Sequence, residues 1–327
     1  FKMTKIIYIE HEVKDHSRTK LICSKFNNPE IIFVDRFSEV FNKRNQSFKI
    51  QKANPALILA KKYKNLLHKT PENYGIGNKY NYYFSYMYNC LFDCKYCFLQ
   101  GMYSSANFVV FVNYEDYFNE IKKISLANKK KNITLFSGYD CDSLAFESIS
   151  NFMSYLINKM PKYENIELEI RTKSTYSKLF SKNIIKNIII AYSFTPERFS
   201  NKYEKGVPSV DKRLKVIKRL SNLGWKLGLR FDPVIIYDGW QEDYKELFVK
   251  IFQNIDIDNV HSITFGKLRF PETIYKKLIK ENISESLFFN LEKKRNSYET
   301  DNENNIESFL RENLTKFIDQ RKIFFNN

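Results

Sequence analysis

The sequence predicts an α/β protein built on a parallel sheet, open or barrel-like, with helices on its outer side. Its 327 residues suit one large α/β domain or two smaller ones. Apolar bursts alternate with amphipathic stretches about six times, which is the pattern of repeated strand, loop and helix units. No apolar run approaches the ~18–20 residues that a membrane-spanning helix requires. We therefore expect a cytoplasmic protein with no membrane partner.

The expected strands and helices follow one another in chain order. The first strand is "YYFSYMYN" at 82–89. Five strand and helix pairs follow, and a final strand, "HSITFGKLRF" at 261–270, closes the series. The pairs are "FVVFVN" with 114–128, "ITLFSG" with 143–160, "IELEIR" with "TYSKLFSK" at 175–182, "NIIIAYSF" with 210–224, and "KLGLRFDPVII" with 244–255.

The alternation divides the chain into three parts. Residues 1–80 carry mixed short strands and a helix and form an N-terminal extension, residues 81–284 form the α/β core, and residues 285–327 form a polar, weakly helical tail. In parallel α/β architectures the functional side chains gather at the carboxyl ends of the strands. The residues just after each strand are therefore the site candidates.

The net charge of +16 indicates an anionic partner such as DNA, because clustered lysine and arginine attract phosphate. An alternative is that the charge reflects an AT-rich genome. Lys, Asn, Ile, Tyr and Phe are all abundant, and lysine exceeds arginine.

Three of the five cysteines lie within "CLFDCKYC", with the spacing C-x₃-C-x₂-C: Cys90, Cys94 and Cys97. A structural zinc site needs four protein ligands, and no histidine lies close in sequence. Three thiolates instead suit a [4Fe-4S] cluster with one iron left open, where S-adenosylmethionine can bind. Reduction of that sulfonium would give a 5′-deoxyadenosyl radical. With an aromatic residue before the last cysteine, this spacing is the radical SAM signature, and such an enzyme needs an external electron donor such as flavodoxin or ferredoxin.

The sequence also resembles the spore photoproduct lyases. The matched segments, in order, are "CLFDCKYCFLQ", "GYDCDSLAFE", "TKSTYSKLF", the long stretch from "IIIAYSFTPERF" to "GWQEDY", and "FGKLRFP". The resemblance implies a partial (β/α)₆ barrel of the radical SAM type. It also implies a lyase that repairs a methylene-bridged thymine dimer formed by ultraviolet light in spore DNA.

Carried over residue by residue, the resemblance assigns the three cysteines of the motif to the cluster and a further set to the cofactor. The expected S-adenosylmethionine contacts are Tyr96, Ser137, Gly138, Lys173, Ser193 and Asp232. Three of these residues also have an alternative role that involves no cofactor. Ser137 can simply end a strand, Lys173 can be a solvated lysine, and Ser193 can cap the following helix.

Two departures from the family concern the hydrogen-atom chemistry. The family's thiol donor aligns with Tyr139, whereas the cysteine here is Cys141. In an extended segment both side chains would point the same way, so Cys141 could reach the same cavity and is the candidate donor. If the chain has already turned at this point, Cys141 could not reach it, and a further alternative is a small buried hydrophobe. The family's relaying tyrosine is replaced by Phe98, and Tyr139 is the candidate that restores a phenol.

The third departure lies in the tail. The lyases carry an aromatic, glycine-containing hairpin that wedges into the duplex. Here the region reads "EKKRNSYETDNENN", which leaves Arg295 and Tyr298 as candidate substrate contacts. The sequence therefore keeps three hypotheses open: a photoproduct lyase, a lyase-like radical SAM enzyme with another substrate, and a non-catalytic iron–sulfur protein that binds nucleic acid.

Overall fold

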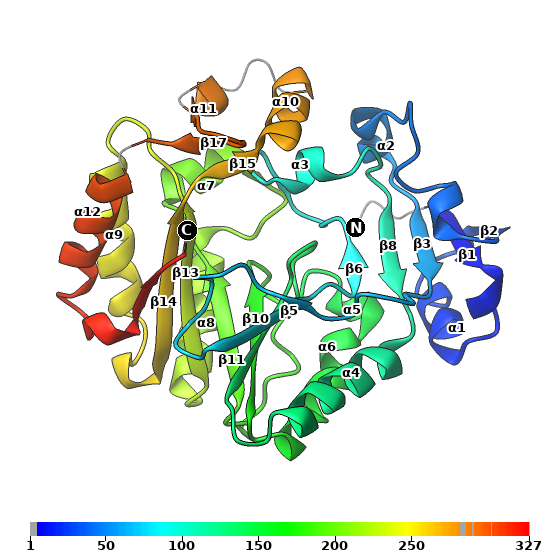
Figure 1. The fold of residues 1–327 in the computed structure, drawn as a ribbon, viewed down its shortest axis with the longest axis horizontal. Helices are drawn as coiled ribbons and strands as arrows, with labels where there is room; N and C mark the ends of the chain where they lie inside the picture. Colours follow the sequence, from blue (N-terminus) through cyan, green and yellow to red (C-terminus); the bar gives the residue numbers. More distant parts are fainter. Residues whose placement is uncertain (1–4, 282–285, 290, 302, 327) are drawn as a thin grey trace.

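The computed structural model describes residues 5–281, 286–289, 291–301 and 303–326, and it contains two largely parallel sheets beside each other (Figure 1). The first sheet has the strand order β2-β1-β3-β8-β6, in which only β6 runs antiparallel. Its strands are β1 (Ile6–Glu10), β2 (Glu30–Val34), β3 (Leu57–Ala60), β6 (Met87–Tyr88) and β8 (Phe108–Phe111). The short elements between these strands are η1 (His11–Val13), α1 (Ser17–Cys23), η2 (Phe37–Glu39) and α2 (Phe48–Ala53).

The expected strand at 108–113 does not join the barrel. It forms β8, which pairs with β3 in parallel, with Phe108 opposite Leu57. Val109, Val110 and Phe111 are all buried, and such a run fits the interior of any parallel sheet. The N-terminal sheet thus extends past the expected boundary at residue 80, because β6 and β8 belong to it.

The second sheet is the partial barrel, and its six central parallel strands confirm the predicted fold class. The strand order is β18-β14-β13-β11-β10-β9-β5-β4, in which only β4 runs antiparallel. Its strands are β4 (His68–Lys69), β5 (Tyr80–Phe84), β9 (Ile133–Ser137), β10 (Ile166–Thr172), β11 (Ile188–Ser193), β13 (Lys226–Val234), β14 (Val260–Lys267) and β18 (Ile323–Phe325).

Amphipathic helices cover the outside of this sheet and bury their apolar faces against it. They are α4 (Tyr114–Ala127), α5 (Glu147–Ser150), α6 (Phe152–Ile157), α8 (Val210–Asn222) and α9 (Trp240–Phe252), with the short turns η3 (Met160–Lys162) and η4 (Ile257–Asn259).

The expected helix at 175–182 is wrong. Turns and bends connect β10 to β11, and this described segment contains no helix. Phe180 is buried against Trp225, with ring centroids 5.3 Å apart, and the Trp225 indole donates to the Ser181 carbonyl at 2.9 Å. These contacts to a distant tryptophan hold the segment in a non-helical path that local sequence does not encode.

The tail is part of the fold. A small antiparallel sheet contains three strands in the order β15 (Arg269–Pro271), β17 (Ser297–Thr300) and β16 (Leu291–Lys293). This sheet lies with α10 (Glu272–Glu281) and α11 (Ser286–Phe289) at the top of the molecule in Figure 1. The weak helical pattern is confirmed as α12 (Glu303–Leu314), which packs against α9. Beyond η5 (Gln320–Lys322), β18 pairs with β14 in the barrel sheet.

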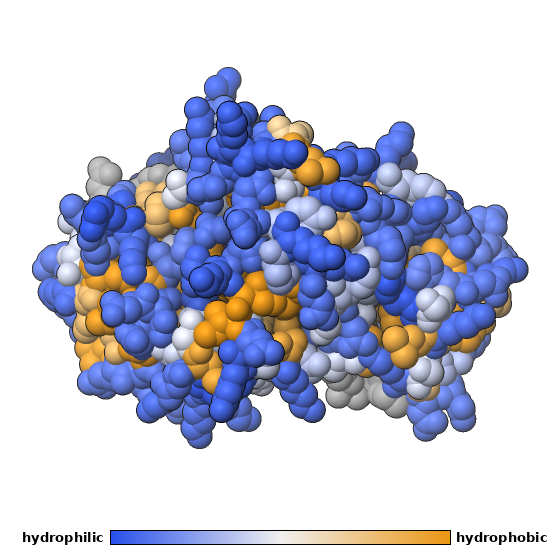
Figure 2. Space-filling view, turned by 90° about the horizontal axis from the view of Figure 1, so that it is seen from below, coloured by the Kyte–Doolittle hydropathy of each residue, from blue (hydrophilic) through white to orange (hydrophobic). Residues whose placement is uncertain are grey.

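The surface is largely polar. Figure 2 shows a face that is mostly hydrophilic, with apolar side chains gathered in smaller areas. Among the helices of the described segments, none is both long and apolar enough to span a lipid bilayer.

Candidate active site

The carboxyl ends of the barrel strands meet at one edge, as predicted. Strand register places Phe84 of β5 opposite Ser137 of β9, and Ser193 of β11 opposite Arg230 of β13. The ends of β10 and β11 are likewise paired through Thr172. Residues that follow these strands therefore share one end of the barrel.

The cysteine loop is fixed to this edge by backbone pairing. Strand β7 (Asp93–Cys94) pairs antiparallel with β12 (Glu204–Lys205), which follows α7 (Glu197–Tyr203). Asp93 forms an ion pair with Lys52 of α2 and accepts from the Gln100 amide at 2.9 Å. The loop is thus anchored to both the barrel and the N-terminal sheet.

The helix after the motif, α3 (Leu99–Met102), packs against α10. A Cβ at Gly101 would stand 3.0 Å from the Ile274 carbonyl oxygen, so this close approach favours glycine.

The three motif cysteines are free thiols in one loop. The Cys97 N–H donates to the Cys94 carbonyl at 3.1 Å, and the Phe92 N–H donates to Cys90 Sγ at 3.4 Å. Burial raises the pKa of all three thiols, that of Cys94 to about 12, so iron would displace protons on binding. In the part of the chain that the structure covers, no three His, Cys, Asp or Glu side chains converge to hold a single metal ion. The thiol set nonetheless fits a [4Fe-4S] cluster, in which three thiolates each bind a different iron.

Two of the expected cofactor residues lie in direct contact. Lys173 Nζ donates to the Tyr96 hydroxyl at 2.8 Å and lies 3.3 Å from Glu204 Oε1. The Tyr96 hydroxyl in turn donates to Glu204. Burial would lower the pKa of Lys173, but Glu204 outweighs it and raises that pKa. Lys173 is therefore an ion-paired ammonium rather than a solvated lysine. In the described part of the chain, one of its three N–H donors remains free to bind a carboxylate.

Glu204 organises this contact, and sequence reasoning missed it. Its carboxylate accepts from Ser200 Oγ at 2.7 Å, Arg213 at 2.8 Å and Thr195 Oγ1 at 3.0 Å. Burial would raise the pKa of Glu204, but Lys173 and Arg213 hold it at about 2. No motif marks this residue in "NKYEKG"; only its burial between two cations identifies it.

Ser137 and Gly138 end β9 in a tightly packed turn. Ser137 Oγ donates to the Glu169 carbonyl at 2.8 Å and lies 2.7 Å from Ser143 Oγ. Gly138 has φ +79°, and a Cβ there would stand 2.5 Å from Ser143 Oγ. Both residues hold the turn itself, and their predicted contact with the cofactor stays a prediction.

Asp142 is a second residue that sequence reasoning missed. Its carboxylate accepts from the N–H groups of Leu144 and Ala145, both at 2.9 Å, and from Thr172 Oγ1 at 2.7 Å. The Lys173 N–H also donates to it at 2.6 Å. Asp142 thus joins the loop after β9 to the end of β10 and positions Lys173. The Asx turn at "DSL" was a usable signal.

Ser193 and Asp232 lie at the ends of β11 and β13. The helix after β11, α7, has no side-chain cap, so the capping alternative for Ser193 is wrong. Asp232 lies 3.9 Å from Arg171, which is also held by Glu169 at 3.0 Å. Glu169 and Arg171 alternate along β10, and Lys173 directly follows the strand. Their side chains therefore share the inner face of the barrel.

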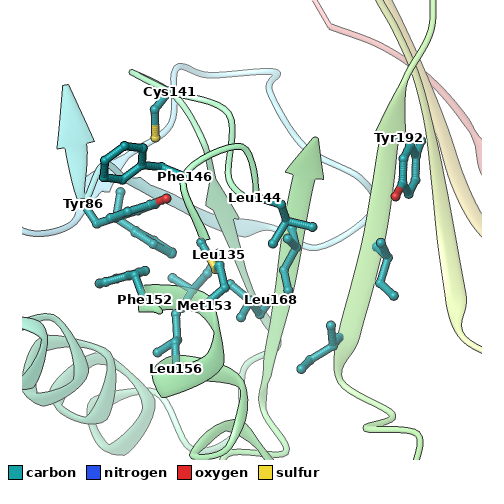
Figure 3. Close-up of a cluster of buried hydrophobic side chains, with 14 of the residues drawn as sticks. Tyr86, Leu135, Cys141, Leu144, Phe146, Phe152, Met153, Leu156, Leu168 and Tyr192 are labelled. Atoms are coloured by element: carbon teal, nitrogen blue, oxygen red, sulfur yellow. The ribbon is translucent and has the colours of Figure 1, made fainter. Parts of the chain in front are cut away.

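Cys141 is buried beside both the apolar core and the cysteine loop. Figure 3 shows its sulfur next to the rings of Tyr86 and Phe146. Burial raises the pKa of its thiol, with the neighbouring Cys90 as the next contribution. The remaining cysteine, Cys23, lies far from this loop, in α1.

Tyr139 and Cys141 do not point the same way, so the expectation of an extended segment at this place is wrong and no longer supports Cys141 as the donor. The chain bends at 139–141 instead of staying extended, so Tyr139 is 47% exposed while Cys141 is 5% exposed. The Tyr139 ring contacts Phe98, with centroids 5.5 Å apart. A phenol therefore lies beside the position where the family's relaying tyrosine is absent.

The tail forms a hairpin despite its missing glycines. Strands β16 and β17 are joined at the turn where the Lys294 N–H donates to the Ser297 carbonyl at 2.8 Å. Arg295 is exposed at this turn. Tyr298 stacks on Tyr275 at 3.7 Å, so it is a packed aromatic in this conformation.

A partial (β/α)₆ barrel with this cysteine loop at the carboxyl ends of its strands defines a radical SAM enzyme. A family model described as "Spore photoproduct lyase" matches residues 3–326. The chain belongs to the spore photoproduct lyase family, which confirms the predicted lyase class, [4Fe-4S] cluster and S-adenosylmethionine.

Individual relatives are distant, and one of them matches nearly the whole chain. The spore photoproduct lyase of Bacillus subtilis (strain 168) is 23% identical over 341 residues, covering 98% of this chain and 96% of the relative. That of Geobacillus sp. (strain Y412MC61) is 22% identical over 222 residues, covering 64% of this chain and 62% of the relative.

Solved structures match the fold closely. A spore photoproduct lyase mutant with bound AdoMet and dinucleoside spore photoproduct superposes with a TM-score of 0.84 at 18% identity, covering 99% of this chain and 98% of the other. A spore photoproduct lyase complexed with the dinucleoside spore photoproduct gives 0.81 at 17% identity, with the same coverage.

Proposed function

We propose that this chain repairs the spore photoproduct in DNA, with Cys141 as the hydrogen donor and Tyr139 as the relaying phenol. The observation that supports the proposal is a further free thiol, Cys141, which is buried in the loop after β9 at the carboxyl edge of the barrel. It lies near enough to Cys90 for the two thiols to interact electrostatically. The bound cluster and S-adenosylmethionine supply the radical that takes a hydrogen atom from the lesion. Cys141 would then give its S–H hydrogen to the thymine radical that remains after the methylene bridge breaks, and the Tyr139 phenol would return a hydrogen atom to the sulfur. The phenoxyl radical left on Tyr139 would recover its hydrogen atom from 5′-deoxyadenosine, which allows S-adenosylmethionine to be regenerated.

The residues around the cofactor have separate tasks in this scheme. Lys173, held by Tyr96 and Glu204, neutralises the methionine carboxylate. Ser137, Gly138, Ser193 and Asp232 complete the binding edge. Arg295, exposed at the hairpin turn, contacts the duplex beside the lesion, with Tyr298 behind it. We propose a flavodoxin or ferredoxin as the electron donor to the cluster, and the cytoplasm as the compartment.

The direct test is an anaerobic assay of the reconstituted protein with S-adenosylmethionine, dithionite and a dinucleotide spore photoproduct. We expect repaired thymine-thymine product together with 5′-deoxyadenosine, both followed by chromatography. If 5′-deoxyadenosine forms without repair, the second candidate function is correct, namely a lyase-like radical SAM enzyme with another substrate. Phe98 and the shifted position of Cys141 favour that candidate.

Replacing the proposed donor separates cofactor cleavage from repair. We expect Cys141→Ala and Cys141→Ser to cleave S-adenosylmethionine but to divert the substrate radical into side products, because neither side chain has a weak S–H bond. The product distribution by mass spectrometry checks this. Cys23→Ala, which removes a distant thiol, is the control. Unchanged thymine product in both Cys141 variants would make Cys141 a core residue alone.

The relay is tested by the ratio of 5′-deoxyadenosine to repaired lesion. We expect Tyr139→Phe to raise this ratio severalfold, because the phenol beside Phe98 is lost while the aromatic ring is kept. Phe98→Tyr added to that variant should lower the ratio again, since it returns a phenol 5.5 Å away. The same ratio in all three proteins would exclude a relay at this place.

A further inference from the structure

A basic hollow lies where the N-terminal sheet meets the barrel. Its volume is about 570 Å³, within the range of sites that hold small organic ligands. The carboxyl ends of β3 and β8 open into it, which is where parallel α/β sheets bind ligands. Its basic side chains come from the loops after β2 and β3: Arg36, Lys61, Lys62 and Lys64.

The positive charge in this hollow is only partly neutralised. Arg36 lies 3.8 Å from the buried Glu10, and Lys61 lies 2.5 Å from Glu12. Among the described residues, neither Lys62 nor Lys64 has an acid within ion-pair distance. An anionic ligand would meet two cations that no protein carboxylate occupies.

Lys62 is the most informative of these residues. It is 8% exposed, and Nζ donates to the Ser85 carbonyl at 3.3 Å. Within the described chain its ammonium has no other hydrogen-bond acceptor, although it carries three donors. Asp140 acts on it only through space, and Asp140 Oδ1 itself has no partner in the described residues. A buried ammonium with unused donors costs free energy unless a ligand takes them up.

Aromatic rings are interleaved with these cations. Lys62 Nζ lies 5.3 Å from the Tyr88 ring centroid and 5.4 Å from that of Phe111. The Arg36 guanidinium lies 4.4 Å from that of Tyr63, which is 46% exposed. Basic groups alternating with aromatic faces are how proteins hold single-stranded nucleic acid.

The rings continue from the hollow to the cysteine loop. His68, which lines the hollow, stacks on Tyr83 at 5.0 Å. Tyr83 contacts Tyr139 at 4.5 Å, and Tyr139 contacts Phe98 at 5.5 Å. An unbroken aromatic row thus joins the hollow to the residue after Cys97.

We propose that the basic hollow binds the DNA strand that flanks the lesion. One backbone phosphate pairs with Lys62 and Lys64, the next phosphate pairs with Arg36, and the bases next to the lesion stack along the aromatic row toward Tyr139. The lesion part of this inference rests on the proposed function, but strand binding by the hollow does not.

Strand binding is tested with an undamaged single-stranded thymine oligonucleotide of about eight nucleotides, by fluorescence anisotropy over a salt series. We expect Arg36→Gln/Lys64→Gln to weaken binding roughly tenfold and to reduce the salt slope by about 1.4, the value for two lost phosphate contacts on a single strand. The matched control is Lys129→Gln/Lys130→Gln, two exposed lysines at the opposite end of the barrel. Affinity and salt slope equal to wild type, or an equal loss in the control, would overturn the inference.

Repair assays connect the hollow to the lesion. A dinucleoside photoproduct lacks flanking phosphates, so we expect Lys62→Met and the Arg36/Lys64 variant to lower oligonucleotide repair relative to dinucleoside repair by roughly tenfold. An unchanged ratio would reject the part of the inference that concerns the lesion. If the wild type repairs neither substrate but the hollow variants still lose oligonucleotide binding, the proposed function fails and strand binding stands.

Discussion

Cys97→Ala is expected to abolish both the iron–sulfur chromophore and the cleavage of S-adenosylmethionine. The cluster depends on three thiolates from one loop, and with two left it has too few protein ligands to persist. The reconstituted variant should lack the brown absorbance, and its 5′-deoxyadenosine should fall to the level seen without enzyme. Visible absorbance, iron content and chromatography measure these outcomes.

A folding defect is a separate explanation that the experiment must exclude. Cys97 is half-buried and its backbone N–H pairs with Cys94, so removing only its Sγ should change stability by about 1 kcal/mol or less. The melting curve of the apoprotein should therefore match that of Cys23→Ala, which should keep its cluster. A variant that retains the chromophore and full activity would reject the ligand assignment.

Features encoded locally were predicted from the sequence. The cysteine spacing lies within eight residues, and β9, β10, β11 and β13 are largely buried strands with a predicted site residue at or near the carboxyl end. The sheet that β8 joins was not predictable, because Val109 and Val110 are buried and would suit either sheet. The same limit explains the missed path at 175–182, where Trp225, far along the chain, decides the conformation.

The hairpin and Glu204 show two further limits. The absence of glycine from this region argues against a hairpin, yet neither Arg295 nor Asn296 is among the described residues with positive φ, so this turn does not need glycine. Glu204 is one of many acidic residues in the sequence. Its role arises only when β12, β10 and α8 place two cations against it.

Glu204→Gln is expected to destabilise the protein strongly. The substitution keeps the volume but removes the charge that Lys173 and Arg213 share, so both would be left as buried cations without their partner. Breaking a buried ion pair in this way costs about 3–5 kcal/mol, which corresponds to a fall in melting temperature of about 4–7 °C for a chain of this length. Thermal unfolding measures it, with the exposed Glu292→Gln as a control that should differ from wild type by less than about 0.5 kcal/mol.

The contribution of the Glu204 charge to the loss of stability can be isolated by pH and by a second substitution. Because the pKa of Glu204 is lowered from 4.5 to about 2 in the folded state, its contribution is present above pH 4.5 and is lost as the pH falls toward 2. The gap in unfolding free energy between wild type and Glu204→Gln should therefore narrow over that range. Lys173→Met added to Glu204→Gln should cost less than the two single changes together, because it removes one of the stranded cations. Strict additivity, or a gap that does not change with pH, would show that Glu204 acts through its hydrogen bonds alone.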